Sequence, residues 1–384
     1  MIWLVVGSLL PSLAVSALAC WIIRRRAPRW GLVDRPGKRK VHTQPVPLGG
    51  GLAIWLAVVV PLAAGHAALL AWSAYGAETG STAADGWRAE LTNFISPHVP
   101  GLLERASDLW FLLSAATVLV ALGLADDWRG LDWRLRLAVQ VLVAGVVVFG
   151  RDWRLTMFID WPLLTGLVSV AWIVGLINSF NMLDNMDGLC AGVAAIAAAI
   201  LAAVMLIAPD PLTHQPQLFV AGFLLVLVGA LVGFLMHNRP PARLFMGDAG
   251  SYFVGFCLAV VTILATFAGG ETPRHAILAP LCVLAVPLYD TVTVVWIRLR
   301  AGQSPFEGDK NHFSHRLVEL GLSPSQAVLT IYLTTAACGL GALLLHQVNA
   351  AGAVVILLLI GCLLSVVAIL ESTARRKRNS RRGH

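Results

Sequence analysis

Long apolar runs fill most of this chain and decide what it can fold into. Hydrophobic residues make up 58% of its 384 residues and charged residues only 13%, whereas a soluble domain carries roughly a quarter charged residues. Eleven runs approach the roughly 20 residues that a helix needs to cross a bilayer. They fall near residues 1–23, 48–74, 109–125, 135–150, 161–177, 188–208, 218–236, 252–270, 276–297, 328–346 and 350–370. The sequence therefore predicts an all-α polytopic membrane protein with about eleven transmembrane helices.

The runs predict one integral-membrane domain over residues 1–371, followed by a basic tail at 372–384. No charge precedes the first run and arginines follow it, so we expect a membrane span there rather than a signal peptide. Six basic residues in the tail favour the headgroups of anionic lipids. The six cysteines occur singly inside apolar runs, which is typical of small buried hydrophobes rather than of metal or disulfide sites.

The basic residues predict the orientation of the chain. If successive runs cross the membrane in alternating directions, 23 of the 28 lysines and arginines fall on one side and 5 on the other. Cytoplasmic loops carry such an excess, so we expect the N-terminus outside and the C-terminus in the cytoplasm. The loops rich in functional groups all fall on that cytoplasmic side: 24–47, 126–134, 178–187, 237–251 and 298–327. This favours a charged cytosolic substrate over a pore, whose polar groups would run through the membrane.

The stretch 178–188 carries the most regular polar pattern of the chain. Asn178 and Asn181 are three residues apart, as are Asp184 and Asp187, and on a helix this spacing places like groups on one face. Oxygen donors without an interleaved thiolate or imidazole suit a hard cation such as Mg²⁺. The alternative is a polar loop between two helices with a helix cap.

Asp126 and Asp127 end another apolar run. Adjacent carboxylates repel each other unless a cation lies nearby. Because neighbouring helical residues point about 100° apart, we expect one carboxylate to face a metal or phosphate and the other to orient a partner. An ordinary acidic helix end is the alternative. Arg134 and Arg136 follow, either as phosphate or headgroup ligands or as interfacial anchors.

The loop 237–251 contains a Gly-Asp-x-Gly-Ser turn that opens the next apolar run. Free amides at a helix N-terminus attract anions, and Asp248 in this turn would hold a metal that bridges to phosphate. Phe245, three residues earlier, offers an aromatic face on which a base can stack.

Two further loops carry cationic groups. Lys40 and His42 lie in a loop rich in proline and glycine, where they suit either phosphate binding or membrane anchoring. His312 and His315 are three residues apart beside Arg316. A zinc site would need partners that the sequence does not supply nearby, whereas contacts to a diphosphate fit all three.

Asp290 lies inside the run 276–297. Acids within the membrane are costly and often functional. The alternative is a buried carboxylate hydrogen-bonded to a neighbouring helix.

Taken in order, these loops resemble those of the membrane-bound transferases that load a sugar-1-phosphate onto polyprenyl phosphate. The motifs are Asp34-Arg-Pro36 with Lys38-Arg39-Lys40-Val-His42, the Asp126–Asp127 pair, NxxNxxDxxDG, NxxxAxxFMGDxGS and SPFxxDxxHxxHRL. The first loop resembles the N-acetylglucosamine branch more than the phospho-N-acetylmuramoyl-pentapeptide branch. Ser314 stands where relatives commonly carry a histidine. The resemblance implies ten or eleven helices and a cytoplasmic active-site groove.

The resemblance also implies roles for individual residues. The catalytic acids would be Asp126, Asp127, Asp184 and Asp187. Asn181 and Asp248 would hold Mg²⁺, or alternatively Mn²⁺. The substrate-binding residues would be Lys40, His42, Asn238, Phe245, His312, His315 and Arg316, with Asp187, Asn238 and Phe245 lining the uridine pocket.

The implied reaction is transfer of N-acetylhexosamine-1-phosphate, foremost GlcNAc-1-phosphate, from the UDP-sugar to undecaprenyl or another polyprenyl phosphate. UMP would leave, and the product would start a lipid-linked cell-envelope glycan. The implied partners are these two substrates and anionic membrane lipid, without nucleic acid, in a monomer or a homodimer. The implied location is the bacterial inner membrane, with the site facing the cytoplasm. Alternatives are the phospho-N-acetylmuramoyl-pentapeptide transferase activity and a membrane transporter, which would need repeated halves with paired polar residues at mid-span.

Overall fold

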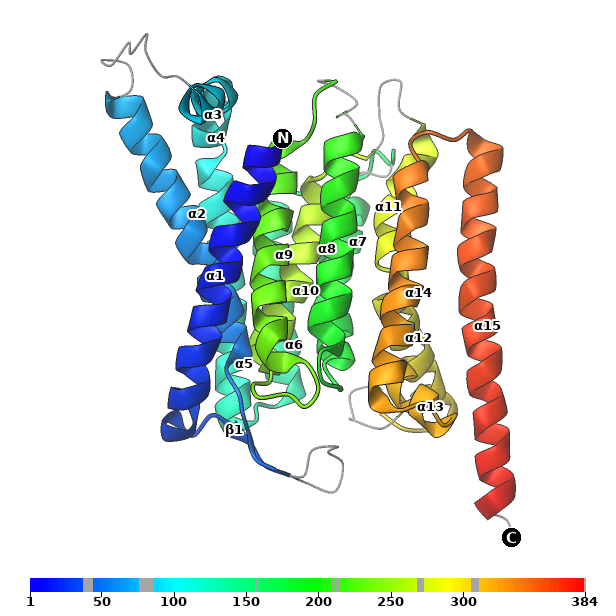
Figure 1. Cartoon of the computed structure of the whole chain (residues 1–384). Helices are drawn as coiled ribbons and strands as arrows, with labels where there is room; N and C mark the ends of the chain where they lie inside the picture. Colours follow the sequence, from blue (N-terminus) through cyan, green and yellow to red (C-terminus); the bar gives the residue numbers. More distant parts are fainter. Residues whose placement is uncertain are drawn as a thin grey trace.

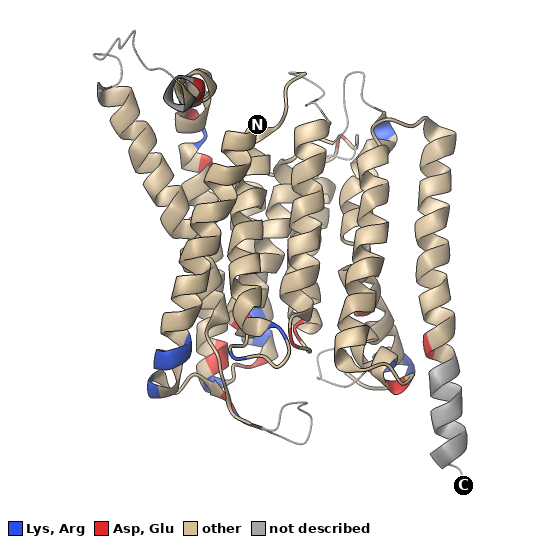
Figure 2. Ribbon diagram, viewed as in Figure 1, with Lys and Arg blue, Asp and Glu red and all other residues tan. Residues whose placement is uncertain are grey.

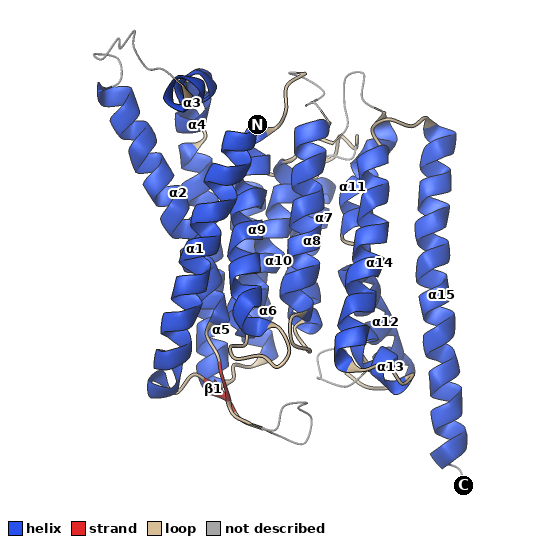
Figure 3. Ribbon diagram, viewed as in Figure 1, coloured by secondary structure: helices blue, strands red, loops and turns tan. Residues whose placement is uncertain are grey.

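The computed structural model shows a bundle of membrane-length helices (Figure 1). The structure describes residues 1–36, 44–75, 86–155, 158–208, 210, 214–267, 273–304 and 311–382. Figure 3 shows how completely helices dominate these parts of the chain. The α-helices are α1 (Ile2–Arg26), α2 (Gly50–Tyr75), α3 (Trp87–Ile95), α4 (Val99–Glu104), α5 (Ala106–Arg129), α6 (Trp133–Gly150), α7 (Pro162–Leu183), α8 (Leu189–Ile207), α9 (Leu218–Asn238), α10 (Gly247–Leu264), α11 (Ala279–Val283), α12 (Ala285–Arg300), α13 (Phe313–Glu319), α14 (Pro324–Leu344) and α15 (Ala350–Arg382). Short 3-10 helices cover Ala27–Trp30, Ser96–His98 and Arg274–Leu278, and the strands are β1 (Val33–Asp34) and β2 (Val46–Pro47).

The predicted all-α polytopic fold is confirmed. Ten of the described helices are long and apolar enough to cross a membrane, and a bent helix pair can supply an eleventh crossing. That pair replaces the unbroken helix predicted over 276–297, which is wrong: the segments Arg274–Val283 and Ala285–Arg300 meet at 67°. Pro287 is the reason, because it has no N–H to bond the carbonyl of Val283 and its ring crowds that carbonyl.

The two ends of the bundle differ in charge. The N-terminus lies at one end and the C-terminus at the other (Figure 1). Most of the described lysines and arginines gather at the end where α1 finishes, together with a group of acidic residues (Figure 2). This asymmetry agrees with the predicted cytoplasmic face, although which side of a membrane it faces stays a prediction.

The core lies around α8, α9 and α10, which are the most buried of the membrane-length helices. α10 packs against both α5 and α7, and α1 packs along α9. Two glycines let backbones meet at the start of α10. A Cβ on Gly51 would lie 2.1 Å from the nitrogen of Gly250, and one on Gly123 would lie 2.3 Å from the nitrogen of Ala249. Any larger residue at either position would push α2 or α5 away from α10.

Two helix boundaries differ from the predicted runs and matter for function. α7 continues to Leu183 rather than ending at 177, so Asn178 and Asn181 are both helical. Asp184 is its C-cap, and Asp187 lies in the turn that follows. The expectation that Asp184 and Asp187 share a helical face is therefore wrong, because the helix ends before them.

Candidate active site

The polar loops meet at the charged end of the bundle (Figure 2). Here α5, α7 and α9 finish and α10 begins. Each of these helices contributes a polar side chain from its last turn or first turn, so the site is built on helix ends rather than on long loops.

Asp127 joins the end of α5 to the start of α10. Its Oδ1 accepts a hydrogen bond from the N–H of Asp248 at 2.9 Å, and its Oδ2 accepts one from the N–H of Ala249 at 3.4 Å. These amides have no partner within their own helix, and a carboxylate beside them also complements the helix dipole. Gly247 has φ +72°, and a Cβ there would lie 2.5 Å from Asp127 Oδ2. Asp127 therefore fixes where Asp248 lies.

Asp126 has different partners from its neighbour, as the helical geometry predicts. It is buried, and its Oδ2 lies 2.6 Å from Nη1 of Arg136 and 3.3 Å from the hydroxyl of Tyr252. The N–H of Leu131 donates to its Oδ1 at 2.6 Å. The same Nη1 of Arg136 lies 3.6 Å from Oδ2 of Asp248. One guanidinium thus bridges acids from α5 and α10.

Asn181 brings α7 to the same place. Its Nδ2 donates to Oδ1 of Asp248 at 2.6 Å and to the hydroxyl of Ser251 at 3.1 Å. Asn178 has a different task, because its Nδ2 donates to Gln140 on α6 at 2.7 Å. Only Asn181 of the predicted asparagine pair therefore faces the acids.

Asp184 lies against the same acids. Burial raises the pKa of Asp184 to about 7, and repulsion from Asp127 and Asp187 adds to the shift, while a hydrogen bond from the N–H of Gly247 opposes it. Asp126, Asp127, Asp184 and Asp248 are called the acidic cluster below. A carboxylate whose pKa is raised by burial and by neighbouring acids is typical of functional sites.

Asp187 and Asn238 hold two loops together. Oδ2 of Asp187 accepts from the N–H of Ala242 at 2.8 Å. Asn238 is buried, and its amide accepts from the N–H of Gly188 at 2.9 Å and donates to the carbonyl of Leu244 at 2.9 Å. The structure thus brings these two residues together, with their polar atoms bonded to backbone. Their role in a uridine pocket stays a prediction.

The half-buried Phe245 sits where the first inner loop returns to the bundle. Its N–H donates to the carbonyl of Pro47, and its carbonyl accepts from the N–H of Gly50, both at 2.9 Å. The first loop is therefore anchored beside the start of α10. Lys40 and His42 lie outside the described residues, so their predicted phosphate contacts are not placed by the structure.

Arg316 and His312 belong to a second, more buried group around α13. Oδ2 of Asp290 lies 2.9 Å from Nδ1 of His312, and Oδ1 accepts from the N–H of Phe313 at 2.6 Å. Arg316 Nε lies 3.1 Å from Oε2 of Glu371 on α15. Asp290 is thus a buried carboxylate hydrogen-bonded to a neighbouring segment. This group is called the α13 network and consists of Tyr289, Asp290, Thr293, His312, Arg316 and Glu371.

Ser314 links the two groups. Its buried hydroxyl donates to Oδ1 of Asn185 at 2.6 Å, within the loop between Asp184 and Asp187. His315, on the same short helix, has its ring 6.3 Å from that of His312. The serine that replaces an expected histidine therefore ties α13 to the loop beside the acidic cluster.

Comparison with known proteins decides the family. Residues 109–266 match the model of glycosyl transferase family 4. Decaprenyl-phosphate N-acetylglucosaminephosphotransferase of Mycolicibacterium smegmatis is 33% identical, over 83% of this chain and 77% of the relative. The chain belongs to glycosyl transferase family 4. The probable undecaprenyl-phosphate N-acetylglucosaminyl 1-phosphate transferase of Bacillus subtilis is 29% identical over 86% of this chain and 81% of its own length. The undecaprenyl-phosphate alpha-N-acetylglucosaminyl 1-phosphate transferase of Escherichia coli is 26% identical over 84% and 78%.

These matches confirm the predicted family and its N-acetylglucosamine branch. The family 4 match runs from α5 to α10. It therefore includes all of the acidic cluster and Asn181, and it ends before the α13 network.

The donor chemistry of this family 4 site fits Mg²⁺. The acidic cluster sets four carboxylates against the single guanidinium of Arg136 within the contacts described above. Within the described residues, no three His, Cys, Asp or Glu side chains form a ready-made cage. Mg²⁺ commonly binds through one or two carboxylates, its own waters and substrate phosphates. Asp248 suits this mode, and turning the Asn181 amide over would present its oxygen.

Sequence reasoning left three contributors out of the predicted site: Arg136, Tyr252 and Glu371. The sequence offers Arg134 and Arg136 equally as ligands for phosphate or headgroups, and it gives no reason to prefer Arg136. Tyr252 directly follows the Gly-Asp-x-Gly-Ser turn. Glu371 ends an apolar run, so the same rule that singled out Asp290, the high cost of an acid in the membrane, would have found it.

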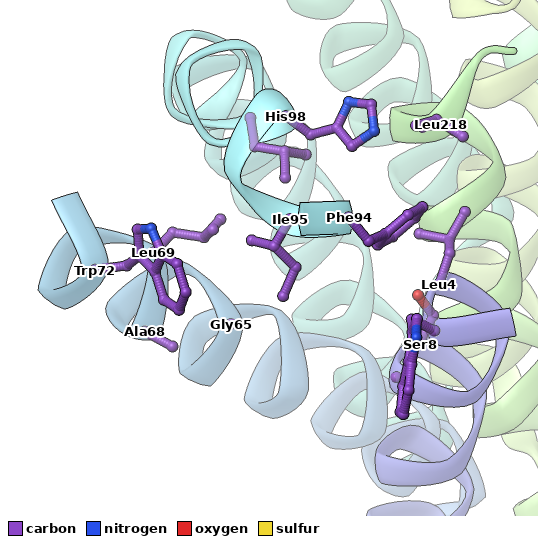
Figure 4. Close-up of a pocket in the computed structure, with 13 residues that line it drawn as sticks. Leu4, Ser8, Gly65, Ala68, Leu69, Trp72, Phe94, Ile95, His98 and Leu218 are labelled. Atoms are coloured by element: carbon purple, nitrogen blue, oxygen red, sulfur yellow. The ribbon is translucent and has the colours of Figure 1, made fainter. Parts of the chain in front are cut away.

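A cavity of about 370 Å³ at the opposite end of the bundle does not suit a nucleotide sugar (Figure 4). It lies between α1, α2 and α3, and Leu4, Leu69, Trp72 and Phe94 are among its lining residues. The described residues lining it include no lysine, arginine or acid, so it lacks the charged groups that hold a diphosphate.

Proposed function

We propose that this family 4 transferase moves GlcNAc-1-phosphate from UDP-GlcNAc to a polyprenyl phosphate, and so starts a lipid-linked cell-envelope glycan. The observation that carries the proposal is the meeting of Asp126, Asn181 and Asp248 from three separate helices at one end of the bundle. The names of the relatives supply the substrates: polyprenyl-phosphate acceptors and N-acetylglucosamine phosphate donors.

In the proposed reaction an oxygen of the polyprenyl phosphate attacks the β-phosphorus of the UDP-sugar. A new P–O bond forms, the bond from that phosphorus to the bridging oxygen breaks, and UMP leaves with the bridging oxygen. Both reactants are anions, so the site mainly neutralises charge and aligns the two phosphates.

Mg²⁺ held by Asp248 and Asn181, or Mn²⁺ in its place, would neutralise phosphate charge and polarise the attacked group. The chain's own residues do the rest. Arg136 supplies a fixed positive charge between Asp126 and Asp248. Asp127 holds the start of α10 and therefore the position of Asp248.

A strong general base is not needed, because a phosphate monoester with a second pKa near about 6 is largely ionised at neutral pH. Asp126 accepts from Arg136, Tyr252 and Leu131, which gives its carboxylate one fixed orientation. We assign it the alignment of the attacking phosphate and the acceptance of any remaining proton. For Asp184 and Asp187, as for Lys40, His42, Phe245 and His315, the implied catalytic and substrate roles are part of the proposal.

The proposal includes the location. The site would face the cytoplasm from the bacterial inner membrane, because the charged end of the bundle carries the described arginine-rich helix end and the site together. Anionic membrane lipid at this face and assembly as a homodimer remain predictions from the sequence.

The transporter alternative is less well supported. An acid inside an apolar run, such as Asp290, is compatible with a transporter, but Asp290 is bonded to His312 and the N–H of Phe313, so it is not an open site for an ion. The phospho-N-acetylmuramoyl-pentapeptide alternative shares the phosphoryl-transfer chemistry and differs in the donor, whose sugar also carries a pentapeptide.

The test incubates membranes containing the full chain with undecaprenyl phosphate and UDP-GlcNAc labelled in its uracil. We expect release of labelled UMP and formation of a lipid-linked GlcNAc diphosphate. Release of UDP would refute sugar-phosphate transfer, and turnover only with UDP-N-acetylmuramoyl-pentapeptide would transfer the assignment to the other branch.

A further inference from the structure

The last membrane helix carries an acid that the reaction outlined above does not use. α15 lies at the edge of the bundle and contacts α13 and α14 (Figure 1). Much of its surface is exposed and apolar, as at Leu358 and Leu359. A narrow buried stripe faces the bundle, and Glu371 belongs to it. The stripe consists of Ala353, Ile356, Val367 and Glu371.

Glu371 is aimed at α12 and α13 through one oxygen. Its Oε2 accepts from the hydroxyl of Tyr289 at 3.0 Å and lies 3.1 Å from Nε of Arg316. Its Oε1 is buried without a hydrogen bond from any described residue. The side chain is 6% exposed. A charge this buried is destabilising unless it is paired, so Arg316 is what allows it to lie there.

Arg316, which lies on α13, passes this contact on to α12. Its Nη2 donates to Thr293 at 3.1 Å and lies 3.9 Å from Oδ1 of Asp290. That carboxylate in turn bonds His312 and the first N–H of α13. The guanidinium of Arg316 is thus shared between Glu371, at 3.1 Å, and Asp290, at 3.9 Å.

The position of α13 matters beyond itself. The helix has only seven residues, too few to be stable alone. His312 caps its N-terminus, it contains His315, and its Ser314 reaches Asn185 beside the acidic cluster. A shift of α13 would therefore move both the histidines and the central loop.

We propose that Glu371 is a positioning residue: through Arg316 it holds α13, and thus its histidines, in register with the acidic cluster. The inference rests on the proposed transfer reaction. It makes α15 a part of the catalytic apparatus, although the helix contributes no group to the acidic cluster. Loss of the charge frees Arg316 to close on Asp290, which loosens the contacts of that carboxylate to His312 and Phe313.

The test compares full-length wild type with Glu371→Gln, Glu371→Asp and a control, Ser365→Ala, in lipid nanodiscs. Ser365 lies on the same helix, and its exposed hydroxyl donates to the carbonyl of Gly361 in its own turn. Two quantities are measured: kcat and KM for UDP-GlcNAc, and hydrogen–deuterium exchange of residues 311–320 and of α10.

Glu371→Gln should lower kcat at least about tenfold with KM changed less than about threefold, because a misplacement of about 1 Å can cost up to about 100-fold. Exchange should rise in 311–320 and not in α10. Glu371→Asp keeps the charge, so it should recover part of the wild-type kcat and part of the protection of residues 311–320 from exchange. Ser365→Ala should match wild type in both quantities.

Wild-type kcat and exchange in Glu371→Gln would overturn the proposal. Faster exchange throughout, α10 included, would also overturn it, because it would show a general stabilising role instead. The exchange measurement needs no substrate. If UDP-GlcNAc is the wrong donor, wild type will show no turnover. Hydrogen–deuterium exchange of residues 311–320 will still show whether Glu371 holds α13. Failure of the proposed function and failure of this inference can therefore be told apart.

Discussion

Two groups of charged residues lie near the same end of this protein, and they satisfy their charges in opposite ways. The acidic cluster holds four carboxylates, and one guanidinium bridges two of them. The α13 network sets two carboxylates against an arginine and a histidine, and supports them with Tyr289 and Thr293. The first group lacks positive charge, and the second supplies its own.

This difference separates the site of chemistry from the structure that supports it. A group of acids that repel each other, of which Asp126 is buried and the others half-buried, stays in place only because the fold imposes it, as such groups do in catalytic and metal sites. A nearly balanced buried network needs no ligand, and its removal leaves unpaired charge. Substitutions should therefore have opposite effects on the two groups.

Asp248→Asn should break the acidic cluster with the largest effect on activity. We expect transfer to fall at least about 10³-fold, the factor that corresponds to losing several kcal/mol of metal assistance. The metal-free protein should melt no lower than wild type, because one repelling charge is removed. UMP release and thermal unfolding of the purified protein measure the two effects.

The matched control is Asp160→Asn, an exposed acid away from the site, which should leave both quantities unchanged. Near-wild-type transfer by Asp248→Asn would remove this residue from the proposed Mg²⁺ site.

Arg316→Gln should lower thermal stability as well as activity, in contrast to Asp248→Asn. It leaves Glu371 and Asp290 buried without their cation, and breaking a buried pair in this way costs about 3 kcal/mol or more. The expected result is a clear fall in the melting temperature along with lower activity. An unchanged melting temperature with a raised KM for UDP-GlcNAc would instead show that Arg316 contacts the diphosphate, as the sequence alone suggested.

The raised pKa of Asp184 predicts that the stability of the metal-free protein depends on pH. Burial and the charge of Asp127 raise the pKa of Asp184 to about 7 from an ordinary value of 3.8. Because the folded state holds this proton more tightly than the unfolded state, its contribution to stability is full below about pH 4 and disappears as pH rises through about 7.

In EDTA, the melting temperature should therefore fall by a few degrees between pH 5 and pH 7, measured against Asp184→Asn, in which the slope should be smaller. Added Mg²⁺ should also reduce the slope. Equal slopes in the two proteins would show that Asp184 does not carry the shift.

Ser314→Ala should have the smallest effect. It removes the one described hydrogen bond from α13 to Asn185, a contact that contributes about 1 kcal/mol. We expect a several-fold fall in kcat with KM for UDP-GlcNAc nearly unchanged, as for Glu371→Gln, and little change in melting temperature. Steady-state kinetics check this, and unaltered kinetics would mean that the contact does not couple α13 to the central loop.

The sequence predicts the fold well because membrane helices are marked by length and apolarity, and the backbone must satisfy its own hydrogen bonds in lipid. It does less well where proline interrupts a run, as at Pro287, and where a helix end is set by a partner from elsewhere. α10 begins at Gly247 because Asp127, about 120 residues earlier, accepts hydrogen bonds from the N–H groups of its first turn. Local pattern contains no trace of that contact.

The sequence predicts which residues form the candidate site, but not the contacts between them. Asp126, Asp127, Asn181, Asp184 and Asp248 stand out because polar residues are rare and regular beside the apolar runs, and the structure brings them together. Their separate contacts follow from packing. For Arg136, nothing in the sequence shows that one of two similar arginines bridges acids from α5 and α10.

The most direct test of the central claim is the dependence of wild-type UMP release on free Mg²⁺. In the proposed reaction, acids from α5 and α10 and the Asn181 amide from α7 bind a divalent ion, and the two phosphates cannot react without it. The rate should fall to background in EDTA and return when Mg²⁺ or Mn²⁺ is added. A full rate of transfer in EDTA would contradict the account.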